Sequence, residues 1–225
     1  MKIRLDKFLS SQNIGTRSTI TKQLKLKKVV VNNQIIQQGS FKIDPELDRV
    51  LFDNNIINYC NFIYIAMNKP QNYICANKDK SKQTIIDLIK EPFANSLHIV
   101  GRLDIDTTGL VLLTNNGSWT HSLKSPNANI EKEYEVTLKD DITDEMLIKL
   151  KSDIFLDNKL LKKVRIEKIY KNTCNIILTE GKYHQIKRMF HYVNNEVIKL
   201  KRIRIGIFNL ENLNIKEGEW TKIII

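Results

Sequence analysis

The residues best suited to chemistry lie between positions 101 and 110, directly before an apolar run. Two carboxylates, Asp104 and Asp106, stand two residues apart here, and Arg102 precedes them at the same spacing. An extended backbone would put all three on one face, while the leucine and isoleucine between them anchor the other face. A carboxylate held in this way can stabilise cationic character or attack a carbon covalently. Spacing alone favours a plainer interpretation, a polar turn before a core strand, because Asp-rich turns are common.

The segments that must position this motif have the sequence pattern of strands more often than that of helices. Residues 130–138 alternate polar and apolar side chains with Tyr134 on the apolar side, which is typical of a half-buried strand and by itself makes Tyr134 a core residue. Residues 180–190 change to a helical pattern that carries Lys187 and Arg188. Further strands are expected at residues 62–67, 73–75, 111–113, 164–170, 174–179, 200–208 and 220–225, and helices at residues 84–89 and 142–150.

These elements predict an α+β domain over residues 60–225. Few strand–helix units repeat at the spacing of a parallel βαβ fold, so we expect a mixed, largely antiparallel sheet.

A smaller helical and hairpin module is predicted over residues 1–56. Two short helices are separated at Gly15, and Thr16 is a candidate cap for the second. The valines at residues 29–31, followed by Asn32 and Asn33, predict a hairpin, because asparagine tolerates the left-handed turn that it needs. Residues 44–61 hold a proline and several acids and are interpreted as a linker.

Charge and composition favour a polyanionic partner. The 225 residues carry 36 Lys and Arg against 25 Asp and Glu, a net charge of +11. Basic residues gather in two blocks, residues 2–28 and residues 181–204, each with a single acid. The three cysteines and four histidines show no metal or disulfide spacing, so we expect no metal. No signal peptide or membrane-spanning run is apparent, and a soluble cytoplasmic protein is expected.

Four segments together resemble known families. The run GRLDIDTTGLVLLTNNG, starting at Gly101, resembles the central motif of the pseudouridine synthases that modify bacterial ribosomal RNA. Lys69-Pro70, the strand with Tyr134 and residues 180–190 resemble their other motifs. Residues 4–9, 16–18 and 29–33 resemble the S4-type RNA-binding domain, although Lys27 and Asn33 stand where that domain usually has glycines. In the same way Asn72 replaces a glycine of the Lys-Pro motif.

The resemblance implies that Asp104 is the catalytic carboxylate of an isomerase that converts uridine to pseudouridine. That rearrangement needs no cofactor or metal. A buried carboxylate tends to protonate, and a neighbouring cation, either Lys187 or Arg188, would hold Asp104 ionised. The target base must leave its stack, because the carboxylate cannot reach C1′ inside a helix.

The same resemblance gives supporting roles to other residues. Tyr134 would pack on the extruded ring. Arg102 would fill the gap that the base leaves or grip the backbone, and Lys69 would line the cleft. Asp106 is expected to be a turn residue or to act from behind the site.

Two basic surfaces are expected to read the RNA. The amino-terminal surface comprises Arg4, Lys7, Arg17, Ser18, Lys22 and Lys25, and the carboxy-terminal surface comprises Lys199, Lys201, Arg202 and Arg204.

Residues 105–109 and 124–132 look most like the branch that modifies uridine 516 of 16S rRNA. We therefore expect a monomeric enzyme that acts on 16S rRNA or on a small-subunit assembly intermediate. The alternatives are a sister enzyme for 23S rRNA and a non-catalytic S4-type RNA-binding or assembly protein. A carboxylate-pair glycosidase is disfavoured, because Asp104 and Asp106 are too close in sequence to flank a substrate.

Overall fold

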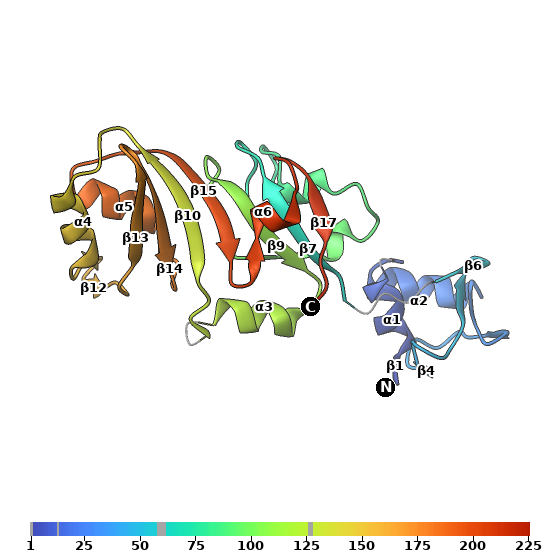
Figure 1. Ribbon diagram of the computed structural model, residues 1–225. Helices are drawn as coiled ribbons and strands as arrows, with labels where there is room; N and C mark the ends of the chain where they lie inside the picture. The colour runs from blue at the N-terminus through green and yellow to red at the C-terminus, as the bar shows by residue number, and fades with distance from the viewer. Residues whose placement is uncertain (1, 13, 58–61, 126–127) are drawn as a thin grey trace. The chain divides into compact units, whose positions relative to one another are not determined.

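A computed structural model describes residues 2–12, 14–57, 62–125 and 128–225, and Cys60 and Pro126 lie outside these ranges. The chain divides into two compact units. The first comprises residues 1–63 and 90–97, and the second comprises residues 64–89 and 98–225 (Figure 1).

The first unit packs two helices and a small sheet around one apolar core. Its sheet has the strand order β3-β2-β5-β6, and β1 pairs separately with β4. The core contains Leu5, Phe8 and Leu9 of the first helix and Ile20 and Leu24 of the second. The elements are β1 (Ile3–Arg4), α1 (Leu5–Ser11), α2 (Arg17–Lys25), β2 (Val29–Val31), β3 (Gln34–Ile35), β4 (Lys42–Ile43), β5 (Val50–Phe52), β6 (Asn55–Ile56) and the 3-10 helix η2 (Ala94–Ser96).

Local sequence signals explain the turns of this unit. The Thr16 side chain accepts a hydrogen bond from the Thr19 backbone N–H and so caps α2 as predicted. Asn32 and Asn33 both have positive φ angles, 47° and 67°, which is the backbone of a two-residue hairpin. Lys27 also has a positive φ, 60°, where a side chain costs about 1 kcal/mol relative to glycine. The chain therefore keeps the turn that a glycine would make, at some cost in stability.

The interpretation of residues 44–61 as a linker is wrong for its central part. Strands β5 and β6 lie there, and Val50 is buried in the core of the unit. Asp53 and Asn54 form the hairpin turn between β5 and β6, and the acids of residues 44–48 lie in or next to the turn that precedes β5; such turns have the same composition as a linker.

The second unit is built on a nine-stranded sheet. Its main path is β13-β14-β10-β15-β9-β7-β17, with β16 added at β15 and β8 at β9 (Figure 1). Its strands are β7 (Tyr64–Lys69), β8 (His98–Val100), β9 (Thr108–Thr114), β10 (Lys132–Leu138), β13 (Arg165–Tyr170), β14 (Thr173–Leu178), β15 (Val197–Ile205), β16 (Phe208–Asn209) and β17 (Trp220–Lys222). A separate hairpin joins β11 (Phe155–Leu156) to β12 (Lys159–Leu160). The helices are η1 (Ile85–Leu88, 3-10), α3 (Gly117–Lys124), α4 (Asp144–Lys151), α5 (Gln185–Tyr192) and α6 (Leu210–Leu213).

Among the described strands of this sheet, only β15 and β9 pair in parallel. This confirms the predicted α+β class with a mixed, largely antiparallel sheet. The expected strand at residues 73–75 is absent from the described structure, where Ile74 makes a single bridge to Thr84.

The parallel junction of β15 and β9 depends on a glycine. Gly109 lies opposite Arg202 and has a φ of 101°. A β-carbon at position 109 would lie 2.2 Å from the Arg202 carbonyl oxygen, so no larger residue fits without moving a strand. Because β9 starts directly after the loop with the two aspartates, this junction also fixes where that loop leaves the sheet.

Candidate active site

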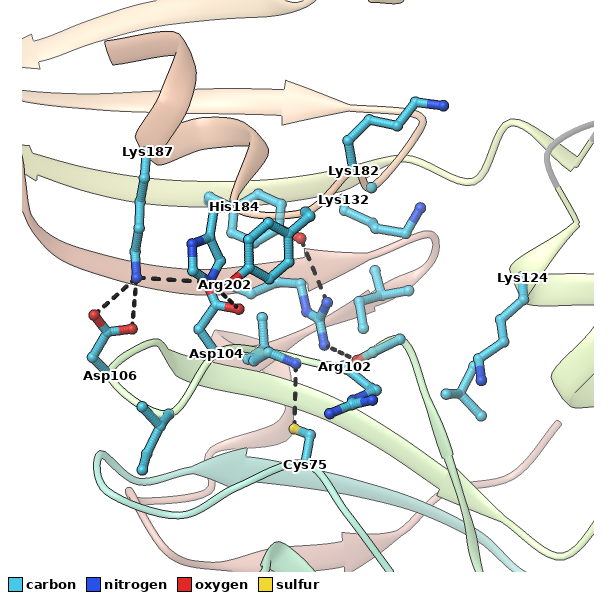
Figure 2. A pocket seen from close by; sticks show the side chains of 18 of the residues that line it. Cys75, Arg102, Asp104, Asp106, Lys124, Lys132, Lys182, His184, Lys187 and Arg202 are labelled. Carbon is cyan, nitrogen blue, oxygen red and sulfur yellow. Dashed lines mark hydrogen bonds and ion pairs between the residues drawn. The ribbon is translucent and has the colours of Figure 1, made fainter. Parts of the chain in front are cut away.

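A cavity of about 750 Å³ opens in the second unit, within the range of small-molecule sites. Its lining comes from the loop before β9, from β10 and β15, and from the turn that leads into α5. Elements far apart in the sequence therefore meet here, and all of them belong to one unit (Figure 2).

The two aspartates lie next to the same lysine. The Lys187 ammonium is 2.7 and 2.8 Å from the two carboxylate oxygens of Asp106 and 3.5 Å from an oxygen of Asp104 (Figure 2). Partial burial alone would raise the pKa of Asp106, but the hydrogen bonds and charge of Lys187 outweigh it, so that the pKa lies below its usual value. Of the two aspartates, Asp106 is thus the closer partner of Lys187, a role that the sequence analysis did not give it.

Arg188, the other cation of the pair, points to a different acid. Its guanidinium makes two hydrogen bonds, of 2.7 and 2.9 Å, to the carboxylate of Asp157 in the turn between β11 and β12. Of Lys187 and Arg188, it is therefore Lys187 that lies beside Asp104.

His184 is a site residue that the sequence analysis missed. Its Nε2 lies 3.5 Å from Asp104 Oδ1, opposite the oxygen that Lys187 approaches. It precedes α5 in a left-handed conformation, with φ 47° and ψ 34°, which is uncommon for a non-glycine residue. The signal that could have found it is its spacing from Lys187, because residues three apart at a helix start share one face.

Tyr134 and Arg202 form the buried side of the cavity. Arg202 is only 1% exposed, and its guanidinium lies 5.9 Å from the centre of the Tyr134 ring. It donates hydrogen bonds of 2.7 Å to the carbonyls of Leu110 and Gly101 and a longer one, 3.5 Å, to the Tyr134 hydroxyl. Arg202 thus ties the start of the aspartate loop to β9 and to Tyr134.

The expectation that Arg202 reads RNA from a basic surface is wrong, because its side chain is buried. Arg204 is also engaged within the fold, since it pairs with Glu133 at 2.8 Å and Glu131 at 3.1 Å. Of that predicted surface, Lys199 is exposed and Lys201 and Arg204 are partly exposed, but the Arg204 guanidinium is already held by the two glutamates.

Lys69 lies under the aspartate loop and is fully buried. Its ammonium donates hydrogen bonds to the backbone carbonyls of Pro70, Ile105 and Thr107, at 3.0, 3.2 and 2.7 Å. Burial lowers the pKa of Lys69, since desolvation disfavours the charged form. Lys69 therefore holds the backbone of the loop, and it is not among the residues that line the cavity.

The aspartate loop is less extended than its spacing suggested. Leu103 is buried, and its N–H donates to the Cys75 sulfur at 3.3 Å. Ile105 is exposed, so it does not anchor the loop as expected. Its carbonyl does so instead, because it accepts from Lys69 and from the N–H of Asn72 at 2.9 Å. Asn72 has a φ of 68° and so adopts the backbone that a glycine would have there.

A row of cations completes the cavity. Arg102, Lys124, Lys132 and Lys182 all line it, and the three lysines lie on the opposite side of the view from Lys187 in Figure 2. Burial, followed by the charge of Arg202, lowers the pKa of Lys132. This arrangement suits a ligand that carries several negative charges, such as a nucleotide within a strand.

The predicted RNA contacts of the first unit are exposed and lie on or next to its two helices. Arg4 is bound by Asp6 at 2.7 Å, and the Ser18 hydroxyl lies 2.9 Å from that of Thr16. The exposed set is Arg4, Lys7, Arg17, Ser18, Lys22 and Lys25.

Within the part of the chain that the structure describes, no three His, Cys, Asp or Glu side chains gather as metal ligands would. No helix among those residues combines the length and apolar character needed to cross a bilayer.

Comparison with known proteins gives consistent matches along the chain. A family model described as RNA pseudouridylate synthase matches residues 63–192, and the S4 domain model matches residues 3–48. A Yersinia pestis protein named ribosomal small subunit pseudouridine synthase A is 39% identical over 221 residues, which is 97% of this chain and 93% of that protein. The protein of the same name from Escherichia coli strain K12 is 37% identical over 220 residues, with 97% and 95% covered. A solved structure described as a pseudouridylate synthase superposes with a TM-score of 0.69 at 36% identity, covering 99% of this chain and 96% of that one.

Proposed function

The chain belongs to the family of RNA pseudouridylate synthases and carries an S4 domain, and we propose that its substrate is small-subunit ribosomal RNA, at uridine 516 of 16S rRNA. The observation that carries the catalytic part of this proposal is the position of Asp104. It lies in the cavity between Lys187 and His184, inside the segment that the synthase family matches.

The reaction breaks the N1–C1′ bond of uridine and joins C1′ to C5 of the same uracil. One proton leaves C5 and one is added at N1, so no atom is gained or lost. The group that the site must supply is a negative charge beside C1′, either to attack it or to stabilise its cationic character. We assign this role to Asp104, which is 33% exposed and so remains reachable from the cavity.

The neighbours of Asp104 support this assignment. Lys187 and His184 approach opposite oxygens of its carboxylate, which limits how the side chain can rotate. Arg202 and Lys69 hold the two ends of its loop by bonds to backbone carbonyls. Such positioning matters because a misplacement of about 1 Å can cost a reaction roughly 100-fold.

The uracil must leave its helix to reach Asp104. In this proposal the ring of Tyr134 packs against the extruded base, since Tyr134 lines the cavity and its hydroxyl is held by Arg202. Arg102 lines the same cavity and contacts the RNA that the base has left.

The choice of target must come from RNA shape, because every uridine offers the same C1′, N1 and C5. The names and full-length similarity of the curated relatives support the small subunit as the source of this RNA. The exposed Lys and Arg side chains of α1 and α2 supply contacts to the phosphates of a folded RNA segment. We further propose that the enzyme acts as a monomer, and a ribosomal substrate implies action in the cytoplasm.

The test is to incubate the protein with 16S RNA, 23S RNA and partly assembled small subunits and to map pseudouridine by chemical sequencing. We expect a single modified uridine, at position 516, and none with the Asp104→Asn variant. Asp106→Asn is the matched control, because it makes the same chemical change on the other side of Lys187 and should slow the reaction without abolishing it.

Other outcomes would contradict separate parts of the proposal. Modification confined to 23S RNA would refute the target but keep the reaction. Tight binding without modification of any RNA would favour a non-catalytic RNA-binding protein. Normal turnover by Asp104→Asn would remove Asp104 from its role.

A further inference from the structure

One exposed aromatic side chain at the cavity has no role in the reaction described above. Tyr183 lines the cavity beside Lys182, and it is 76% exposed. A tyrosine this open to water presents most of its ring, with an apolar body and a polar tip, to any ligand that enters the cavity.

One face of the Tyr183 ring is already covered. The ring stacks on the imidazole of His184, with the centres 3.8 Å apart and the planes 19° from parallel. The high exposure of Tyr183 leaves its second face open. The pair therefore offers a flat aromatic surface, and its inner member contacts Asp104 at 3.5 Å.

The turn that carries these rings is held firmly. Gln185 is buried, and its side chain accepts from the N–H of Lys182 at 2.9 Å and donates to Glu180 at 2.9 Å. The left-handed backbone of His184 is a strained conformation for a non-glycine residue, and such strain tends to cluster at functional sites. The structure thus maintains an unfavourable backbone at the residue that supports the open ring.

We propose that Tyr183 and His184 form a stacking platform for a nucleobase next to the flipped uridine in the RNA strand. This inference rests on the proposed function and adds a specificity-determining contact to it. Aromatic side chains bind unpaired bases by stacking on their faces. The base would lie as a third ring on Tyr183, while the cations of the same cavity, Lys182 and Lys132 among them, contact its phosphates.

The platform would couple two recognition events. A base stacked on Tyr183 fixes the strand one nucleotide away from Asp104, so it limits which uridine can enter the cavity. Stacking is tolerant of base identity, because every base has an aromatic face. The platform therefore selects for an unpaired neighbour rather than for one particular base.

The probe for the test is a fragment of 16S RNA around uridine 516 with the fluorescent base 2-aminopurine at either neighbour of that uridine. Binding is measured in the Asp104→Asn background, so that the RNA is not altered during the measurement. We expect the fluorescence of one of the two positions to be quenched on binding. Tyr183→Phe should keep the quenching, and Tyr183→Ala should remove it and weaken binding by about 5- to 150-fold, the range for loss of one stacked base.

Tyr170→Ala is the matched control. Tyr170 is 67% exposed on β13 and does not line the cavity, so its loss should change neither quenching nor affinity. Unchanged quenching and affinity in Tyr183→Ala, or equal weakening by Tyr170→Ala, would overturn the platform.

Pseudouridine formation by the wild-type protein on the unlabelled fragment separates the two proposals. If no pseudouridine forms but quenching still depends on Tyr183, the proposed target fails and the platform stands. If pseudouridine forms and Tyr183→Ala matches the wild-type protein in both binding and rate, the platform fails and the proposed function stands.

Discussion

Replacing the buried Arg202 with methionine should weaken both the fold and the reaction. Methionine fills a similar volume but donates nothing, so the carbonyls of Leu110 and Gly101 lose hydrogen bonds of 2.7 Å each. A buried acceptor without a partner costs about 1–3 kcal/mol, or about 2–6 kcal/mol for the two. The substitution also removes the buried positive charge and its desolvation penalty, which offsets part of that cost. We therefore expect Arg202→Met to lower the free energy of unfolding by about 2–4 kcal/mol.

The reaction should lose more than the stability change alone explains. Without Arg202, the Gly101 carbonyl that begins the aspartate loop is free to move, and Tyr134 loses the donor to its hydroxyl. We expect the rate of pseudouridine formation to fall by roughly 10- to 100-fold, the order associated with displacements of about 1 Å at a reacting centre. RNA affinity should change little, because the side chain does not reach the surface.

The assay combines urea unfolding, single-turnover rates at a temperature where both proteins are folded, and RNA affinity at several salt concentrations. Lys199→Met is the matched control, since Lys199 is exposed on the same strand. It should leave stability unchanged and, if Lys199 contacts a phosphate, flatten the slope of log affinity against log salt by about 0.7–0.9. The reasoning is refuted if Arg202→Met unfolds like the wild-type protein and shows only the flattened slope.

Three other changes test the remaining cations. Lys187→Met should slow the reaction at least about 10-fold, measured in single turnover, with little loss of RNA affinity. Because the pKa of Asp106 is held below 3.8, its pair with Lys187 stabilises the fold above about pH 5, and this contribution is lost as the pH falls below about 4. At 55% exposure of Asp106 it should amount to no more than about 1 kcal/mol in urea unfolding. Lys69→Met should leave three carbonyls unpaired and lower both the free energy of unfolding and the rate of pseudouridine formation. An unaffected rate would show that the aspartate loop keeps its conformation without Lys69. The double variant Lys22→Ala with Lys25→Ala should keep the single-turnover rate at saturating enzyme but weaken RNA binding, and unchanged binding would remove α2 from the RNA contacts.

The parts of the fold that could be predicted from the sequence are those that local chemistry decides. Thr16 caps a helix wherever its neighbours allow one, and the Asn32-Asn33 pair specifies a tight hairpin by itself. The alternation around Tyr134 marks a strand with one buried face. Sequence could not reveal the parallel pairing of β9 with β15, because it joins residues more than 90 positions apart through a contact that depends on Gly109.

The candidate site likewise has parts that the sequence predicted and parts that it could not predict. The spacing of Asp104 and Asp106 marked the loop, but which of two adjacent cations would reach it depends on the direction of α5, which sequence does not fix. The buried role of Arg202 was not recognised from the sequence, because the basic residues next to it suggested an exposed surface. Its spacing of two from the buried Leu200 was the available signal, because alternate residues of a strand share a face.

The buried cations differ from the exposed ones in what they bind. The hydrogen bonds of Lys69 and Arg202 go to carbonyl and hydroxyl oxygens, and neither residue takes part in an ion pair among the residues that the structure describes. Their positive charges therefore have no carboxylate in direct contact, and in a poorly solvated interior they act over a longer range than charges in water. Lys187, by contrast, is largely neutralised by the two aspartates that it contacts. The positive potential of the cavity thus comes in part from residues that never touch the RNA. This potential would stabilise the negative charge that uracil develops once its bond to C1′ is broken, so the same two residues can both hold the loop in place and favour the reaction electrostatically.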